Sequence, residues 1–189
     1  MNKKYLEQYK LLYKIKPKYG ASSVKFFDIL YSMLEKEKDN IIYVLDYGCG
    51  RSPLLKMLQE KLNYLKIFRY DPVFDEYNTL PKCKIDFVIC TDVLQHVPID
   101  ELDETINKIS SISKKCFFHI KCTDHPTKFP NGEPTNITIR EKEWWKKYLL
   151  KYFSSVEEIN YPDETTATFR TRWYLCLIII LFWLQIIAD

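Results

Sequence analysis

The sequence predicts an α/β protein with a doubly wound, mostly parallel sheet, and three observations carry this prediction. Short apolar runs of strand length alternate with segments of helical periodicity along most of the 189 residues. The first run, 41–45, ends at an acid that is followed by two glycines and a helical pattern. The last two runs, 156–161 and 166–172, predict a closing antiparallel hairpin.

Length and composition indicate one globular domain. Charged residues make up 28% of the chain, hydrophobic residues 47%, and the net charge is +3. The lysines are scattered, so we expect no nucleic-acid partner. We also expect no signal peptide, because the first residues are lysine-rich and lack an apolar core. The six cysteines lie in or near predicted strands, which favours a reducing, cytoplasmic location.

Residues 1–40 are predicted to form two helices, over 3–15 and 22–37, that cap the domain. Each segment repeats apolar residues on one helical face. Ser22 or the serine after it is the expected N-cap of the second helix. Tyr19 lies in the loop between the helices, where it either contacts a ligand or packs.

The domain proper, 41–172, starts with a buried parallel strand that ends at Asp46. A glycine-containing loop follows, and its glycines would let the backbone approach a ligand closely. The helix that starts behind this loop is expected to offer free N–H groups and a partial positive charge to an anion. The loop residues are Gly48, Cys49 and Gly50.

A second apolar run, 64–70, ends at Asp71, about 20 residues after the loop. A carboxylate at this strand tip is placed to accept hydrogen bonds from two ribose hydroxyls. Together the two strands predict a nucleoside-binding site. The loop lacks the third glycine of the dinucleotide fingerprint, which disfavours a nicotinamide oxidoreductase.

The segment 71–84 has room for a loop or a rudimentary strand only, so the chain is shortened after its second strand. A buried strand over 85–90 follows, then a helix with Asp100 as the expected cap. Residues 116–120 read as a fifth strand and 141–153 as a helix. Ligands of such a sheet bind at the carboxyl ends of its strands.

The Asp-x-Gly-x-Gly pattern at 46–50 resembles motif I of class I S-adenosylmethionine-dependent methyltransferases. Residues 92–98 resemble the Asp-Val-Leu-Glu-His run that follows the fourth strand of many small-molecule methyltransferases. The resemblance extends over roughly residues 19–153, and its later motifs are similar to a subgroup of small bacterial and phage enzymes. These later motifs are His125-Pro126, Asn131-Gly132 and Glu143-Trp144-Trp145.

This resemblance implies a Rossmann-like fold, S-adenosylmethionine as the cofactor, and a small-molecule or sugar-like methyl acceptor. A general base is needed only if the acceptor loses a proton, and the candidates are His96 and His125. His96 could equally be a helix-start residue that is bonded locally. Trp144 and Trp145 either wall an acceptor pocket or pack in the core. The cofactor-binding residues implied by the resemblance are Asp46, Gly48, Cys49, Gly50, Asp71, Pro72, Asp92 and Val93.

Two further alternatives remain open from the sequence. A non-catalytic S-adenosylmethionine-binding or membrane-attached scaffold protein has the same motifs without turnover. A zinc site is suggested by cysteines and histidines at every third position from Cys116 to His125. Most of this stretch reads as a strand, where residues three apart face opposite sides, so no metal site is predicted. The oligomeric state is not defined by the sequence.

Residues 173–188 form a nearly uncharged run of 16 residues, just short of the length of about 20 that spans a bilayer. Arg170 and Arg172 precede it, and aromatic residues stand near both ends, as at membrane interfaces. The tail 173–189 is interpreted as a membrane anchor or surface helix, as an extension packed on the domain, or as a non-native end. As an anchor it would leave the domain on the cytoplasmic side.

Overall fold

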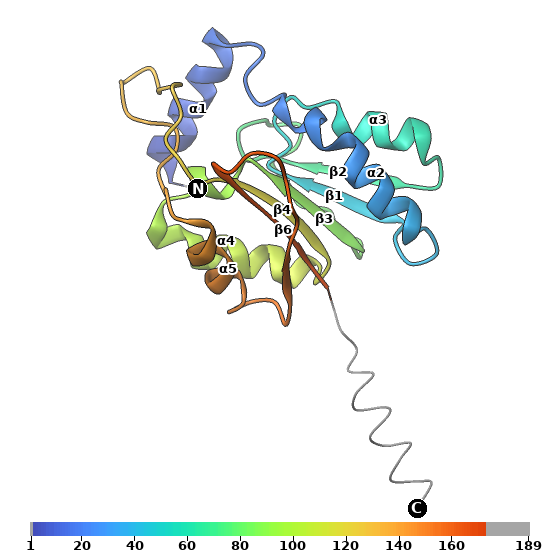
Figure 1. The fold of residues 1–189 in the computed structure, drawn as a ribbon. Coiled ribbons are helices and arrows are strands. Elements are labelled where there is room, and N and C mark those ends of the chain that lie inside the picture. The colour runs from blue at the N-terminus through green and yellow to red at the C-terminus, as the bar shows by residue number, and fades with distance from the viewer. Residues whose placement is uncertain (1, 173–189) are drawn as a thin grey trace, which may run out of the picture.

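The computed structural model describes residues 2–172, which form a six-stranded sheet between two layers of helices (Figure 1). The strand order is β2-β1-β3-β4-β6-β5. The first four strands pair in parallel, whereas β6 pairs antiparallel with β4 and with β5. This arrangement confirms the predicted doubly wound sheet with a closing hairpin. The strands are β1 Tyr43–Tyr47, β2 Lys66–Tyr70, β3 Phe87–Thr91, β4 Cys116–Lys121, β5 Val156–Glu158 and β6 Thr166–Thr171.

Helices α2 and α3 cover one face of the sheet, and α4 and α5 cover the other (Figure 1). The α-helices are α1 Lys3–Ile15, α2 Phe27–Lys36, α3 Leu54–Lys61, α4 Ile99–Ile112 and α5 Lys142–Leu149. Two short 3-10 helices, η1 Ser22–Phe26 and η2 Leu94–His96, precede α2 and α4.

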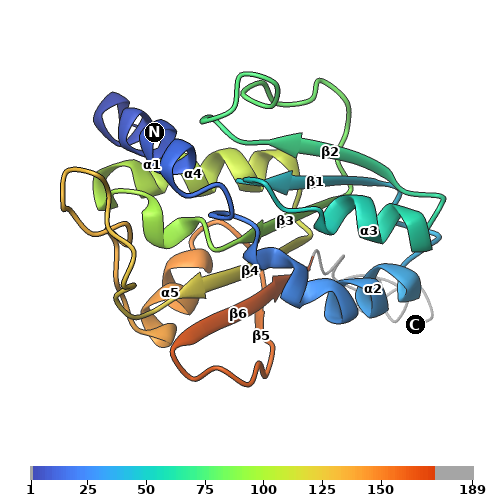
Figure 2. The same cartoon turned by 90° about the horizontal axis from the view of Figure 1, so that it is seen from above.

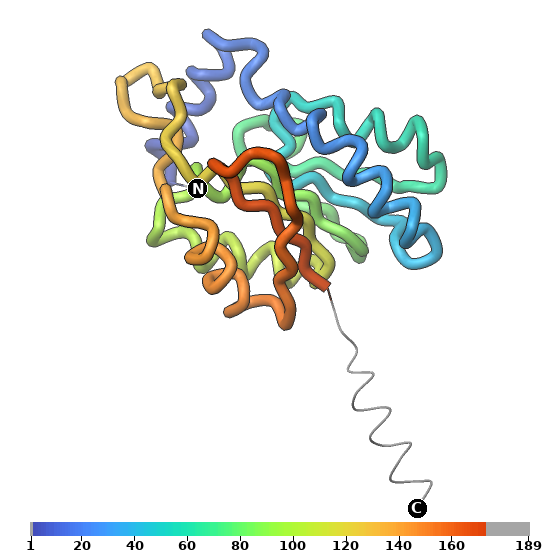
Figure 3. The backbone as a smooth tube through the Cα atoms, viewed as in Figure 1, coloured from blue at the N-terminus to red at the C-terminus, as the bar shows by residue number. Residues whose placement is uncertain are grey.

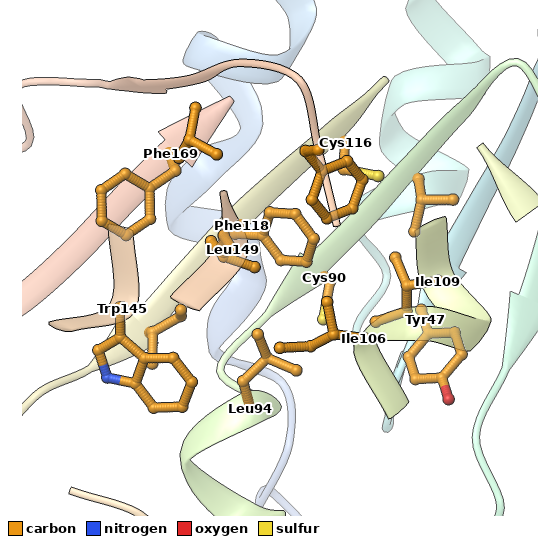
Figure 4. Close-up of a cluster of buried hydrophobic side chains, with 14 of the residues drawn as sticks. Tyr47, Cys90, Leu94, Ile106, Ile109, Cys116, Phe118, Trp145, Leu149 and Phe169 are labelled. Atoms are coloured by element: carbon orange, nitrogen blue, oxygen red, sulfur yellow. The ribbon is translucent and has the colours of Figure 1, made fainter. Parts of the chain in front are cut away.

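Alternating residues of the strands bury their side chains against the two helical layers. Phe118 of β4 packs with Ile106 of α4 and Trp145 of α5 in the larger core (Figure 4). Phe117, the residue before Phe118 in the chain, packs in the core on the opposite face of the sheet, which contains Leu30 of α2 and Leu58 of α3. Each fully buried side chain of this size stabilises the fold by roughly 1.5–3 kcal/mol. These two cores fix the strand ends on which the site depends.

The chain between β2 and β3 forms turns only, which confirms the predicted shortening. The Asp71 N–H donates to the carbonyl of Tyr77 at 2.9 Å, which closes the first of these turns. No strand forms in this segment, so the strand at 116–121, which was expected to be the fifth, is the fourth strand, β4. Strand β2 lies at one edge of the sheet.

Two predicted helix caps are wrong. Ser22 begins η1, and its Oγ donates to Asp92 Oδ2 at 3.0 Å instead of capping a helix. Asp100 lies inside the first turn of α4, whose N-cap position is occupied by Pro98. A carboxylate in the first turn still interacts favourably with the helix dipole.

Helix α1 packs on loops beyond the carboxyl ends of the parallel strands (Figure 2). Tyr9 of α1 packs edge-on against Phe129, with ring centroids 4.8 Å apart. Lys4 forms an ion pair with Glu133 at 2.6 Å. Figure 3 shows this N-terminal segment beside the long loop before α5. The helix therefore covers the edge at which the parallel strands end.

The apolar tail 173–189, and with it the predicted membrane contact, lies outside the described residues. Among residues 2–172, no helix is both long and apolar enough to cross a membrane.

Candidate functional site

A cavity of about 420 Å³ lies at the carboxyl ends of β1 to β4, under α1. Its position is the one expected for ligands of a doubly wound sheet. Eight of the ten predicted site residues line it. These are Gly48, Cys49, Asp71, Pro72, Asp92, Val93, His96 and His125. The other two, Asp46 and Gly50, are buried and absent from its lining.

The glycine loop is bound to β2 by its own amides. The N–H groups of Gly48 and Cys49 donate to the carbonyl of Tyr70 at 2.7 and 3.1 Å. Gly48 has a φ of +78°, and a Cβ there would lie 2.3 Å from a methyl carbon of Val93. Glycine is therefore required at position 48 both for its backbone conformation and for contact with Val93.

Free N–H groups for an anion were expected at the start of α3, behind the glycine loop, and the amides that lead into this helix have acceptors within the protein. The Arg51 N–H donates to the carbonyl of Gly20, and the Ser52 N–H donates to the carbonyl of Cys49. Leu54, the first residue of α3, donates its N–H to Ser52 Oγ at 3.1 Å. The amides of the loop are thus used within the protein.

Asp71 occupies the predicted position at the tip of β2, with only 5% of its surface exposed. Its Oδ2 accepts the Gly50 N–H and its Oδ1 accepts the Val73 N–H, both at 2.9 Å. Burial raises the pKa of Asp71, and the two amides oppose that shift. An ionised carboxylate offers about four lone-pair sites, so both oxygens keep capacity for further donors.

Asp46 is buried in β1, next to the glycine loop in sequence, and does not line the cavity. Burial raises the pKa of Asp46 to about 7, although nearby Arg69 partly offsets that rise. The Arg69 guanidinium also donates to the carbonyl of Gly50 at 3.0 Å and to the hydroxyl of Tyr77 at 2.9 Å. Arg69 thereby joins the glycine loop to the shortened segment after β2.

His96 lies in the cavity wall as a neutral imidazole of defined tautomer. Its Nδ1 is 2.7 Å from the carbonyl oxygen of Thr135, which can only accept, so Nδ1 carries the proton. The Tyr9 hydroxyl of α1 donates to the same oxygen at 3.3 Å. Burial lowers the pKa of His96. The remaining lone pair is on Nε2, which lies 3.4 Å from the Gln95 amide nitrogen.

His125 and Asn136 line the cavity from the loop before α5. His125 Nδ1 accepts the Thr127 N–H at 3.1 Å, and the Asn136 amide donates to the carbonyl of Thr123 at 2.8 Å. Neither Trp144 nor Trp145 lines the cavity, and Trp145 is fully buried in the core. Of the two interpretations of this tryptophan pair, core packing describes Trp145.

No group of three or more residues that could hold a metal ion occurs within residues 2–172. Cys116 Sγ contacts the carbonyl of Ser113, and His119 bonds to Thr168 on the neighbouring strand. The histidines and cysteines of this stretch therefore have separate partners.

The rule that ligands bind at strand ends placed Lys121, the last residue of β4, at the edge that carries the site. Three other polar residues of the cavity wall were not singled out from the sequence as site residues. Ser22 and Lys25 come from the N-terminal segment, and Asp163 comes from the turn before β6. No local motif marks these three, because only the folded chain brings them to the cavity.

The fold and the strand-end cavity define a Rossmann-like protein of the class I methyltransferase type. Residues 21–166 match the methyltransferase domain family, and the chain belongs to this family. The predicted family is thereby confirmed. No curated protein matches the sequence significantly.

Three solved structures share this fold with the chain and are distant from it in sequence. An O-methyltransferase family protein from Burkholderia thailandensis matches with a TM-score of 0.58 and 11% identity, over 80% of this chain and 57% of that one. The 1,6-didemethyltoxoflavin-N1-methyltransferase of the same organism matches with a TM-score of 0.58 and 10% identity, over 89% of this chain and 88% of that one. The DhpI–SAH complex matches with a TM-score of 0.57 and 14% identity, over 91% of this chain and 98% of that one. The chain spans just over half the length of the first two structures matched, 57% and 53%.

Proposed function

We propose that the protein transfers a methyl group from S-adenosylmethionine to a small-molecule or sugar-like acceptor. A methyltransferase domain of this fold implies S-adenosylmethionine, and two matched structures are complexes with its demethylated product. The observation that carries the proposal is the buried Asp71 carboxylate in the wall of the strand-end cavity. At this position it accepts the two ribose hydroxyls of the nucleoside.

The residues around Asp71 fit an adenosyl cofactor. A cavity of about 420 Å³ lies within the range of roughly 300–1,000 Å³ typical of small-molecule sites. Val93 follows β3 and Pro72 follows Asp71, so both flank the nucleoside, together with the backbone of Asp92. Asp46 and Gly50 act by fixing the loop. The loop residues Gly48 and Cys49 complete this side of the cavity.

Bound S-adenosylmethionine supplies a methyl group on a positively charged sulfur, which is an activated leaving group. The protein's task is to align the acceptor and to exclude water. Helix α1 excludes water by covering the cavity. His96 accepts the acceptor's proton at Nε2 when the reacting group is a hydroxyl, because Thr135 fixes its proton on Nδ1. His125 is the second candidate for this role.

Calorimetry with S-adenosylmethionine, S-adenosylhomocysteine and NAD tests the cofactor. We expect binding of the first two and none of NAD. Release of S-adenosylhomocysteine in the presence of a panel of hydroxylated, amine and thiol acceptors then tests turnover. Binding without turnover on any acceptor would favour a non-catalytic binding or scaffold protein. Binding of NAD alone would contradict the proposal.

A further inference from the structure

Asp92 stands out in the cavity wall because its backbone is strained. Its φ is +57°, and it is the one non-glycine residue with a positive φ among residues 2–172. Such a conformation is unfavourable for a non-glycine residue and persists only where surrounding contacts impose it. Here the Asp92 N–H donates to the carbonyl of His119 at 2.8 Å. The strain turns the side chain toward three groups from two other elements.

The two oxygens of the Asp92 carboxylate have different surroundings. Oδ2 accepts from Ser22 Oγ at 3.0 Å and lies 3.4 Å from Lys25 Nζ. Oδ1 lies 3.7 Å from His119 Nε2, beyond the length of a hydrogen bond. The side chain is 23% exposed, and the residue lines the cavity. Oδ1 is therefore the oxygen that retains acceptor capacity for a ligand.

His119 is a fully buried histidine with one unpartnered ring nitrogen. It lies on β4 between the rings of Phe26 and Tyr161, at centroid distances of 4.4 and 5.1 Å. Nδ1 is 2.8 Å from Thr168 Oγ1, whereas Nε2 has no hydrogen-bond partner. Burial lowers the pKa of His119 to about 4, so the ring is neutral near pH 7. With Thr168 as donor to Nδ1, the Nε2–H points at Asp92.

We propose that the Asp92 carboxylate binds a hydroxyl group of the methyl acceptor, and that His119 is the positioning residue that orients it. This inference rests on the proposed function and names the acceptor class. Lys25 already compensates the charge of the carboxylate, so a neutral hydroxyl donor suits the site better than a cationic amine. A bound hydroxyl gives Oδ1 a donor from the cavity, while the neutral His119 ring lies 3.7 Å from the same oxygen on the core side.

The test uses the full chain saturated with S-adenosylhomocysteine and two matched pairs of probes. The pairs are phenol with anisole, and methyl α-D-glucopyranoside with its tetra-O-methyl ether. Carbon and nitrogen NMR signals of the Asp92 carboxyl and the His119 ring report binding. We expect a hydroxylated probe to shift both signals and to bind on the order of tenfold or more tighter than its ether, as for a hydrogen bond to a charged group.

Variants separate binding from folding. Asp92→Gly removes the carboxylate but accepts the positive φ. In this variant the affinities of the hydroxylated probe and its ether should differ by no more than about twofold. Asp92→Asn tolerates the same backbone and serves if the glycine variant unfolds. His119→Phe keeps a ring without the N–H donor and should reduce the preference for hydroxylated probes over their ethers. His119→Gln should restore part of that preference. Asp75→Asn is the matched control, since it changes an exposed carboxylate outside the cavity lining and should keep the preference of the unmodified chain.

The possible results are distinguishable. If the unmodified chain does not bind S-adenosylhomocysteine, the proposed function itself is wrong. Normal binding of that compound, with ethers bound as tightly as the hydroxylated probes or no shift at Asp92, would overturn the hydroxyl assignment. An unchanged preference in His119→Phe would reduce His119 to a packing residue.

Discussion

Replacing Asp71 by asparagine tests the nucleoside site in the most quantitative way. If the carboxylate accepts two ribose hydroxyls, each charge-assisted bond contributes about 1.5–3 kcal/mol. Asparagine keeps one acceptor oxygen and replaces the other with an NH₂ group, so loss of one charge-assisted bond costs about 1.5–3 kcal/mol and weakens binding by roughly 10- to 10²-fold. The two carboxylate oxygens of Asp71 also accept the N–H groups of Gly50 and Val73, and the NH₂ that replaces one oxygen leaves one of these N–H groups without its acceptor. Unfolding free energy should therefore fall by about 1–3 kcal/mol as well.

Calorimetry with S-adenosylhomocysteine measures the first effect, and urea unfolding measures the second. The matched control is Asp75→Asn, which makes the same change at an exposed position of the same segment. We expect the control to bind and unfold like the unmodified chain. A folded Asp71→Asn protein whose dissociation constant stays within about threefold of the original would refute the ribose assignment.

Two other predictions concern stability. Gly48→Ala should destabilise the fold by several kcal/mol, because its Cβ would lie 2.3 Å from a methyl carbon of Val93. Gly132→Ala, at a similar φ, meets no atom within 4 Å and should cost only about 1–2 kcal/mol. Urea unfolding of both variants measures the difference. The folded protein holds the pKa of Asp46 near 7 against an ordinary 3.8, so the folded state binds this proton more tightly than the unfolded chain. Stability should therefore fall as pH rises toward 7, by about 3 kcal/mol between pH 5 and pH 8. Asp46→Asn should flatten that dependence, and a slope equal to that of the unmodified chain would contradict the assignment.

The sequence predicted the parts of the fold that depend on local pattern. Apolar runs located the strands because a buried parallel strand needs little else. The boundaries moved by a few residues, so that Asp46 lies inside β1 and not after it. The numbering of β4 was wrong because a family expectation supplied a strand that the short segment after Asp71 does not form.

The site was predicted where it depends on strand ends and missed where it depends on tertiary contact. Asp71 and Asp92 were found because each follows a strand directly. The acceptors of the loop amides were not predicted, since they belong to another strand, as the carbonyl of Tyr70 does. His119 was set aside as a strand residue, and only the fold shows its Nε2 facing Asp92. Such pairings have no signature in sequence spacing.

The structure of the protein with S-adenosylhomocysteine bound is the most direct test of the whole account. We expect both ribose hydroxyls within hydrogen-bond distance of the Asp71 carboxylate, and the sulfur facing the part of the cavity between Asp92 and His96. A nucleoside bound away from Asp71, or a sulfur turned from these two side chains, would contradict the assignment of this cavity as a methyl-transfer site.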